Sequence, residues 1–354
     1  MNELDARIRR AWEGRISGCQ LGKPVEVLSM REGHEALTAY LDAAGTPRPR
    51  DYIPFVEHRL VRRDWCAGAF ERSEPDDDVN YSVLALMMLE QHGDALSTAD
   101  VARHWMKWLP VGSTYTAERA AYRILLEKGA EWFPEGAEPG FDLTECAQNP
   151  YNDWIGAQIR ADVYGWVCPG EPARAARLAQ VDATLSHVGA GVEGAVFVAA
   201  AGAALADRPL DRALAAALDQ LAPDGEAAAA VRFGLDLAGE ADGDVRIRDR
   251  YAALSPVATV NNLALVVWAL ASHEHDFDGA IGDVVAAGLD TDCNGATVGA
   301  LWGLSEAGAK KGVPEHWTRP WSGRVGVSLA GISELALDDL VDRTVAVTGR
   351  LAAA

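Results

Sequence analysis

The sequence predicts an all-α fold. Almost every apolar segment repeats with the spacing of a helix, and no run of alternating residues is bounded by turn signals as strands are. No internal repeat of fixed period is present. The chain has 354 residues, of which 49% are hydrophobic and 24% charged, a balance typical of globular proteins. We therefore expect residues 1–354 to form a single domain, with residues 27–75 as an irregular polar insertion.

The net charge and the cysteines exclude several classes of protein. A formal net charge of −20 is unsuited to binding nucleic acid, whose phosphate backbone is itself densely negative, but it suits a protein that binds divalent cations. No apolar stretch reaches the roughly 18 residues of a membrane-spanning helix, and the N-terminus lacks the apolar core of a signal peptide. We therefore expect neither nucleic acid nor membrane as a partner.

A cytoplasmic location is expected from an odd number of cysteines without a CxxC motif, namely Cys19, Cys66, Cys146, Cys168 and Cys293.

The first predicted helix covers residues 4–22, whose apolar side chains share one face. Gly22 and Pro24 are expected to end it. Glu26 is then expected on the following loop or turn, where a glutamate is usually just solvated. The polar insertion after it is rich in proline and arginine, and we expect one short helix there, near residues 34–41.

Three consecutive aspartates, Asp76, Asp77 and Asp78, precede a strongly apolar run at residues 81–89. A helix that starts here needs only one aspartate to cap it. Three carboxylates in one turn repel each other unless water or a metal ion compensates their charge. This cluster is therefore not explained by capping alone.

The middle of the chain is expected to be helical, with one polar loop. Residues 149–160 form a loop that runs into a helix, a place where backbone N–H groups can meet a ligand. His187, taken alone, is better explained as a hydrogen-bonded structural histidine than as a catalyst. A helical pair with Trp105, Trp108 and Trp132 is expected at residues 97–135, further helices at 191–206, 208–240 and 261–270, and residues 329–351 close the chain.

A second acidic cluster, Asp290-Thr291-Asp292-Cys293-Asn294, lies between an amphipathic run and a segment rich in glycine and alanine. A solvated acidic cap is one explanation, because helix N-termini favour negative charge. One aspartate or asparagine is enough for a cap, however, and the small residues that follow predict close packing against other helices. We favour a hard-cation site. Two aspartate clusters at helix ends of an all-α chain suggest a two-metal enzyme site.

Two other aspartate-rich enzyme classes fit less well. Residues 284–292 loosely resemble the strand and DxD motif of haloacid dehalogenase-type phosphotransferases, but that motif normally opens a chain of alternating strands and helices. Residues 76–80 align loosely with the DDxxD motif of class I terpene synthases. Asn294, Val298 and Trp302 fall on the spacing of the second motif of that class, but Val298 and Trp302 then stand where hydroxyl and glutamate ligands are required. An aromatic content of 7% also suits a carbocation cavity poorly.

Four segments, in the right order over residues 8–350, carry a resemblance to a known family. They are Gly18–Glu26 beside the pattern GDALGxPxE, Asp76–Val79 beside TDDT, Gly156–Arg160 and Leu185–His187 beside a GAAMR loop and a TH segment, and Asp290–Ala296 beside DTDTNAA. By these motifs the chain resembles the ADP-ribosylglycohydrolase family, which includes the dinitrogenase reductase-activating glycohydrolase.

The resemblance implies an orthogonal multi-helix bundle with two magnesium ions in a central cleft, for which Mn²⁺ is an alternative. Such enzymes hydrolyse an N- or O-glycosidic bond at C1″ of a ribose. By position, the implied metal ligands are Asp76, Asp77, Asp78, Asp290, Asp292 and Cys293. The implied catalytic residues are Glu26, which matches the family's mobile acidic residue, Asp77 and Asp292. The implied substrate contacts are Trp154, Gly156, Ala157, Gln158, Arg160 and His187.

The chain departs from the family pattern at several motif positions. Cys19 replaces the aspartate of GDALG, and Val79 replaces the last threonine of TDDT. Cys293 replaces the threonine of DTDTN, and because a thiol is a soft ligand and a poor partner for Mg²⁺, this change bears on the second ion. Such losses leave one non-enzyme alternative, a ligand-binding or structural member of the same fold that has lost turnover.

The substrate expectation follows from a further departure. Trp154 and Ile155 precede Gly156 where the family has glycine-rich backbone for the ADP-ribose phosphates. A bulky tryptophan there would narrow a pyrophosphate cradle or stack on a base. We therefore expect a small-molecule substrate such as a nucleoside or nucleotide-like ribosyl compound, with ADP-ribosyl conjugates, including an ADP-ribosylated protein, as the other possibility.

Overall fold

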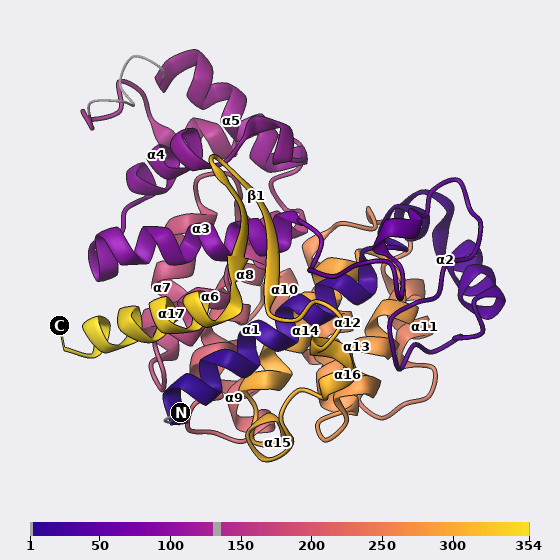
Figure 1. Ribbon diagram of the computed structural model, residues 1–354. Coiled ribbons are helices and arrows are strands. Elements are labelled where there is room, and N and C mark those ends of the chain that lie inside the picture. Colours follow the sequence, from indigo (N-terminus) through magenta and orange to yellow (C-terminus); the bar gives the residue numbers. More distant parts are fainter. Residues whose placement is uncertain (1–2, 130–135, 354) are drawn as a thin grey trace.

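The fold is built almost entirely from α-helices, as the sequence predicts (Figure 1). The computed structural model describes residues 3–129 and 136–353, so Trp132 of the predicted helical pair lies outside the described residues. Among the described residues, the buried apolar side chains form one core cluster that extends from Ile8 to Leu351. None of the described helices is long and apolar enough to cross a membrane.

The helices follow one another along the chain, with one small sheet near its end. The N-terminal half forms α1 (Glu3–Gly22), α2 (Glu26–Ala43), α3 (Asp77–His92), α4 (Thr98–Trp108), α5 (Thr116–Gly129), the 3-10 helix η6 (Ile155–Arg160), α6 (Asp162–Trp166) and α7 (Pro172–Ala183). The C-terminal half forms α8 (Gly189–Ala204), α9 (Leu210–Leu218), α10 (Glu226–Asp236), α11 (Gly243–Arg250), α12 (Thr259–Ser272), α13 (Phe277–Ala286), α14 (Thr291–Leu304), α15 (Glu306–Lys311), α16 (Glu315–Thr318), β1 (Arg324–Leu329), β2 (Ile332–Ala336) and α17 (Leu337–Ala352).

The antiparallel pair α1 and α14 forms the centre of the core. Their backbones touch where glycines face each other, so that a Cβ added to Gly18 would lie 1.9 Å from the carbonyl oxygen of Gly295. One helical turn further along α1, a Cβ added to Gly22 would lie 2.3 Å from the backbone of Thr291. The close packing predicted from the small residues after the second acidic cluster is thus confirmed. It brings the C-terminus of α1 beside the N-terminus of α14.

We expect Gly18→Ala to destabilise the protein by about 3 kcal/mol, because the new methyl group has to push two packed backbones apart. The measurement is the free energy of unfolding by denaturant titration. Gly349→Ala in α17 is the matched control, since a Cβ there meets nothing within 4 Å. This control should gain about 0.5–1 kcal/mol from the better helix propensity of alanine. Equal effects at the two positions would contradict the backbone contact.

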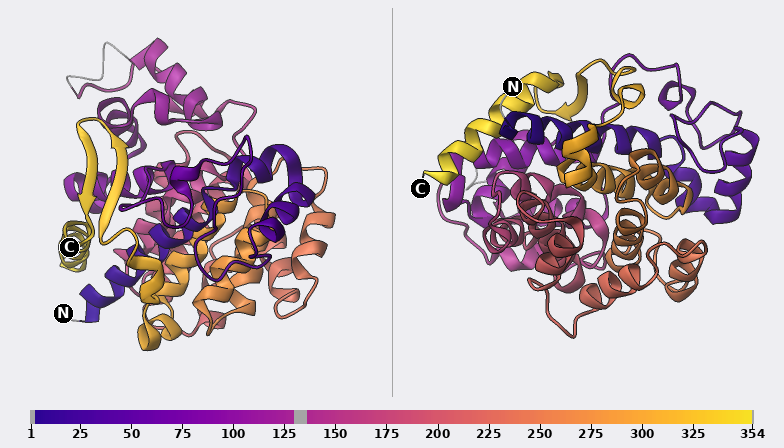
Figure 2. Two further views of the ribbon diagram at one scale, coloured as in Figure 1. Left: turned by 45° about the vertical axis from the view of Figure 1, so that its right-hand side comes forward. Right: turned by 90° about the horizontal axis from the view of Figure 1, so that it is seen from below.

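The remaining helices pack around this pair in two groups. On one side α3 and α17 lie against α1, and Figure 2 shows α17, in yellow, alongside the N-terminal part of α1. On the other side α12 and α13 pack against α14. The alanine-rich α8 packs against α6, α7 and α9, and its confirmed helical run lies in the core. The ends of α1, α3 and α14 therefore meet inside the molecule.

The prediction for the polar insertion was partly wrong. The helix expected near residues 34–41 begins at Glu26 and ends at Ala43, with a kink at Gly33, whose φ is 81°. Glu26 is consequently the first residue of α2 and does not lie on a loop. The turn between α1 and α2 is short because Val25 N–H bonds to the carbonyl oxygen of Gly22 at 3.1 Å. The segment from residue 44 to residue 76 contains no α-helix, as expected.

Two more predictions need correction. The helix expected at residues 208–240 is two helices, α9 and α10, which are separated at Pro223-Asp224-Gly225 because proline and glycine break a helix. The antiparallel strands β1 and β2, which the sequence did not predict, precede α17. Strand β1 also pairs with Ser73, whose N–H donates to the carbonyl oxygen of Arg324 at 2.9 Å. This contact holds the segment that leads into the first acidic cluster.

Candidate functional site

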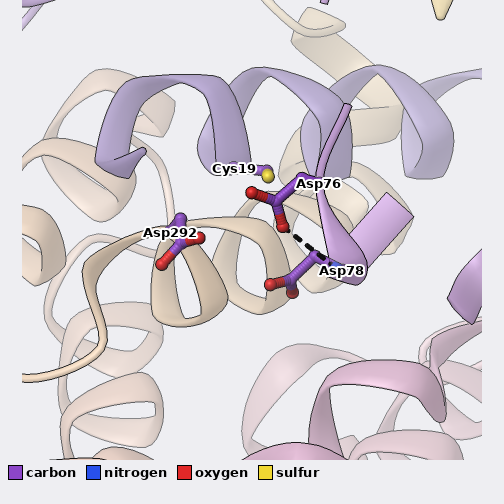
Figure 3. A group of neighbouring side chains, drawn as sticks. All are labelled: Cys19, Asp76, Asp78 and Asp292. Carbon is purple, nitrogen blue, oxygen red and sulfur yellow. Dashed lines mark hydrogen bonds between the residues drawn. The ribbon is translucent and has the colours of Figure 1, made fainter. Parts of the chain in front are cut away.

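The two acidic clusters meet at one buried point, as predicted. Figure 3 shows Cys19 from α1, Asp76 and Asp78 from the start of α3, and Asp292 from the start of α14 directed at a common space. Four ligand atoms, one from each of these residues, lie within 4.8 Å of one another. A second group of the same kind consists of Asp290, Asp292 and Cys293, so Asp292 belongs to both.

Several carboxylate oxygens of this cluster have no protein partner. Among the described residues, Asp78 Oδ2, Asp290 Oδ1 and Asp292 Oδ1 are buried and accept no hydrogen bond. A buried, unpaired carboxylate is costly unless a cation or a proton compensates it. Oxygen donors of this type, gathered from the starts of α3 and α14, are what a hard divalent cation such as Mg²⁺ or Mn²⁺ requires. The residues present therefore fit a divalent cation.

The raised pKa values of the clustered carboxylates also indicate that a cation is required to keep them ionised. Burial raises the pKa of Asp78 well above its ordinary value, and the charges of Asp76 and Asp290 raise it further against the opposing Arg15. Burial likewise raises the pKa of Asp292, with additional contributions from Glu26 and Asp76. In the absence of a cation these groups resist ionisation, so a bound cation and a deprotonated cluster should stabilise each other.

Raising the pH should destabilise the metal-free protein, and a divalent cation should reverse the effect. Because the folded-state pKa values of Asp78 and Asp292 lie above the unfolded values of about 4, the folded state binds more protons. Stability therefore falls as the pH rises through the folded-state pKa values. We expect a lower Tm for chelator-treated protein at about pH 9 than at about pH 7.5, an interval above the ordinary histidine pKa of about 6.5.

Mg²⁺ or Mn²⁺ should raise the Tm more at the higher of these pH values, since binding stabilises the folded state by mass action. Thermal melts with and without the ion are the measurement. His187 does not disturb the comparison, because burial and then Arg160 lower its pKa well below the ordinary value and keep it neutral. A cation-induced Tm increase that is the same at both pH values would contradict the coupling.

The second cluster is held by contacts from distant helices and does not act as a solvated cap. Asp290 is buried at the N-cap position of α14 and makes no side-chain capping bond. Its N–H donates to Asn262 Oδ1 at 3.3 Å, and Asn294 Nδ2 donates to the same oxygen at 2.8 Å. Thr291 Oγ1 donates to the carbonyl oxygen of Gly22 at 2.9 Å, which ties the cluster to the end of α1. The carboxylates are thereby left for another partner.

Arg15, which the sequence did not single out, forms an ion pair with Asp78 of the first cluster. Its guanidinium is fully buried, and Nη2 lies 3.1 Å from Asp78 Oδ1 while Nη1 lies 2.8 Å from Asp162 Oδ2. The Nε atom donates to Ser82 Oγ at 2.6 Å. One oxygen of Asp78 is therefore fixed by Arg15, and the other faces the cluster. An arginine on the buried face of the first helix was the only signal in the sequence.

Lys23 is a second residue whose part in the site was missed. It lies in the turn between α1 and α2, and its Nζ is 2.5 Å from Asp76 Oδ2. Burial alone would raise the pKa of Asp76, but the Lys23 ammonium holds it below the ordinary value. Cys19 and Cys293 are buried beside these carboxylates, and burial raises both thiol pKa values, so both stay protonated in the metal-free protein.

Glu26 and Asp77 lie at the accessible side of the cluster, where both are half-buried. Burial raises the pKa of Glu26, and the charges of Asp290, Asp76 and Asp77 raise it further. The pKa of Asp77 is raised in the same way by burial and by its two aspartate neighbours. The three residues to which the sequence assigned catalysis, Glu26, Asp77 and Asp292, therefore share one electrostatic environment.

Two of the expected substrate contacts belong to a buried ionic network. Arg160 donates to Glu118 Oε1 at 2.8 Å, to Asp182 Oδ1 at 2.9 Å and to Ser186 Oγ at 2.9 Å. His187 Nδ1 lies 2.8 Å from the same Ser186 oxygen. Both side chains are buried, and the contacts of Arg160 link η6 to Glu118 of α5 and Asp182 of α7. His187 Nε2 has no hydrogen-bond partner among the described residues.

The other expected contacts lie on and next to η6. Gln158 is buried, and within the described part of the chain neither of its amide atoms has a hydrogen-bond partner. Trp154 is half-buried and meets Tyr151 edge to face at 4.7 Å. Gly156 approaches the carboxylate of Glu118 so closely that a Cβ would lie 2.1 Å from it, and Ala157 is buried beside it. Substrate binding by these residues stays a prediction.

Comparisons with known proteins bear on what this site does. A family model described as ADP-ribosylglycohydrolase matches residues 1–350. Among solved structures, one described as "ADP-ribosylglycohydrolase-related protein complex" is 19% identical, with a TM-score of 0.61 and 99% of both chains covered. At that identity the likeness concerns the fold alone. A search of curated proteins finds no match.

Proposed function

This chain belongs to the ADP-ribosylglycohydrolase family, whose members hydrolyse glycosyl bonds, and we propose that it is a magnesium-dependent hydrolase of a ribosidic bond. The bond is an N- or O-glycosidic bond at C1″ of the ribose. The substrate is either an ADP-ribosylated compound or a smaller nucleoside- or nucleotide-like ribosyl compound. One observation carries the proposal, namely the buried, unpartnered oxygens of Asp78, Asp290 and Asp292, residues that fall in two ligand groups linked by Asp292.

Asp78, Asp290 and Asp292 would hold the ion, with Asp76 in one ligand group with Asp78 and Asp292. Asp77, the other ligand implied by the family resemblance, belongs to neither group of the described residues. A divalent ion held there supplies a Lewis acid that orients ribose hydroxyls and acidifies water. The surrounding carboxylates stabilise the positive charge that develops at C1″ as the glycosidic bond breaks. Asp292 belongs to both ligand groups, which makes it the ligand we expect to matter most.

Glu26 is the residue best placed to move a proton. It stands at the half-buried edge of the cluster, at the start of α2, where the ionised aspartates disfavour a further negative charge. A carboxyl with a raised pKa can keep its proton near neutral pH and donate it to the leaving group. In the ionised form the same group can accept a proton from attacking water. Either role requires Glu26 to face the substrate directly.

We expect Glu26→Gln to lower kcat by about 10²–10⁴-fold, the usual contribution of a general acid or base. Binding of Mg²⁺, measured by equilibrium dialysis, should persist, because the unpartnered oxygens lie on other residues. Glu35→Gln is the control, since Glu35 is an exposed glutamate of the same helix. Loss of metal binding together with turnover would show that Glu26 is a ligand and not the proton carrier.

A substrate panel tests the proposal itself. Purified protein with Mg²⁺ is incubated with nucleosides, ADP-ribose conjugates and ADP-ribosylated arginine, and released base or ADP-ribose is separated chromatographically. Hydrolysis of nucleosides supports the smaller substrate, for which the bulky Trp154 before Gly156 argues. Release of ADP-ribose from the conjugates alone would contradict the smaller substrate, but it would still support a glycosidase. No release from any of them, with the metal bound, contradicts the hydrolase.

The cellular setting follows from the cysteines. All five are free and buried in the structure, a pattern typical of the reducing cytoplasm. We therefore propose a cytoplasmic enzyme whose partner is a small ribosyl or ADP-ribosyl substrate, with an ADP-ribosylated protein as the macromolecular alternative.

A further inference from the structure

Lys23 brings a fixed positive charge into the acidic cluster. It is 7% exposed, its Nζ lies 2.5 Å from Asp76 Oδ2, and it stands 4.7 Å from the ring centroid of Trp65. Its backbone is fixed as well, because the Lys23 N–H donates to the carbonyl oxygen of Cys19 at 2.9 Å. The short turn between α1 and α2 thus directs the ammonium group at Asp76.

The cluster is consequently divided into two unlike halves. In the first half both oxygens of Asp76 are occupied, since Oδ1 accepts from Asp78 N–H at 3.0 Å and Oδ2 accepts from Lys23. The Cys19 thiol, which lies in one ligand group with Asp76, Asp78 and Asp292, is a poor ligand for a hard cation.

In the second half Asp78 Oδ2, Asp290 Oδ1 and Asp292 Oδ1 are buried without a partner among the described residues. Arg15 pairs with the other oxygen of Asp78 at 3.1 Å, and no lysine or arginine of the described chain forms an ion pair with Asp290 or Asp292. A second divalent ion placed on Asp76 would meet the ammonium that already shares its carboxylate, and like charges at such range repel strongly.

We propose that Lys23 takes the place of one of the two divalent ions implied by the family resemblance, so that this chain binds a single ion at Asp78, Asp290 and Asp292. The proposal rests on the proposed metal-dependent function and specifies the composition of its site. Lys23 would act as a positioning residue that holds Asp76 and balances its charge. The Cys19 thiol then needs no metal to explain it, since it lies on the half that Lys23 serves, whereas Cys293 lies in the ligand group of Asp290 and Asp292.

Counting bound Mn²⁺ tests the proposal without reference to activity. Equilibrium dialysis of the full chain against Mn²⁺ should give one ion per chain, and electron paramagnetic resonance should show no coupling between neighbouring ions. Lys23→Met, which keeps the length of the side chain and removes the charge, should bind two. Lys23→Arg, which keeps the charge, should still bind one.

The outcomes separate this proposal from the proposed function. Two ions in the wild-type protein would overturn the role of Lys23 and leave the hydrolase intact. One ion in a folded Lys23→Met protein would also overturn it, and so would two in Lys23→Arg. No ion in the wild-type protein would overturn both. If Lys23→Met fails to fold, as judged by circular dichroism, Lys23→Gln takes its place, and the wild-type count remains decisive.

Discussion

Replacing Asp292 with asparagine is expected to weaken Mg²⁺ or Mn²⁺ binding at least tenfold and to lower kcat by about 10³-fold or more. Asp292 is the carboxylate shared by both ligand groups, and its buried Oδ1 has no partner in the described part of the protein. Asparagine keeps the shape of the side chain but removes the charge that attracts the ion. Isothermal titration with Mn²⁺ and steady-state kinetics on the cleaved substrate measure the two effects.

The same substitution should stabilise the metal-free protein near neutral pH, because burial and the neighbouring carboxylates disfavour ionisation of Asp292 in the folded state, whereas asparagine needs no proton to stay neutral. Loss of metal binding with an increased Tm would therefore exclude simple misfolding. Asp249→Asn, at an exposed position of α11, is the control and should change neither property. A wild-type protein that binds no divalent ion would instead support the non-enzyme alternative, a member of the fold that has lost turnover.

Replacing Arg15 with methionine is expected to destabilise the protein by about 3–5 kcal/mol, the usual effect of removing one partner from a buried ionic network. The fully buried guanidinium compensates Asp78 and Asp162, both of which are themselves buried. Denaturant unfolding at neutral pH measures the loss. Metal binding should also weaken, because Asp78 loses the contact that orients it.

The destabilisation by Arg15→Met should be smaller in acid. Burial raises the pKa of Asp162 to about 6 even with Arg15 opposing it, so a proton can replace the lost guanidinium as the pH falls. Arg123→Met is the matched control, because this exposed arginine only approaches Glu127 at 3.9 Å. Its replacement should change the free energy of unfolding by less than about 0.5 kcal/mol. An equal loss at both arginines would contradict the network.

Part of the site could be predicted because its signal is local. Asp76 to Asp78 and Asp290 to Asp292 are each more acidic than a helix cap needs, and that excess is visible without any contact. The place of Glu26 was harder to predict, because it depends on a turn of three residues after which α2 begins earlier than expected. Arg160 and His187 show the reverse case, in which motif residues turn out to be enclosed in an ionic network with Glu118 and Ser186.

The sequence alone determined the helical class of this protein and its two aspartate clusters, because helical periodicity and excess local charge are properties of neighbouring residues. Only the tertiary structure decided which distant groups serve those clusters. Arg15 lies 63 positions from Asp78, and Lys23 lies 53 positions from Asp76. Charges at such separations meet only where the glycines of α1 and α14 let the helix ends come together. Burial then makes each such pairing decisive, because an isolated charge is costly away from water.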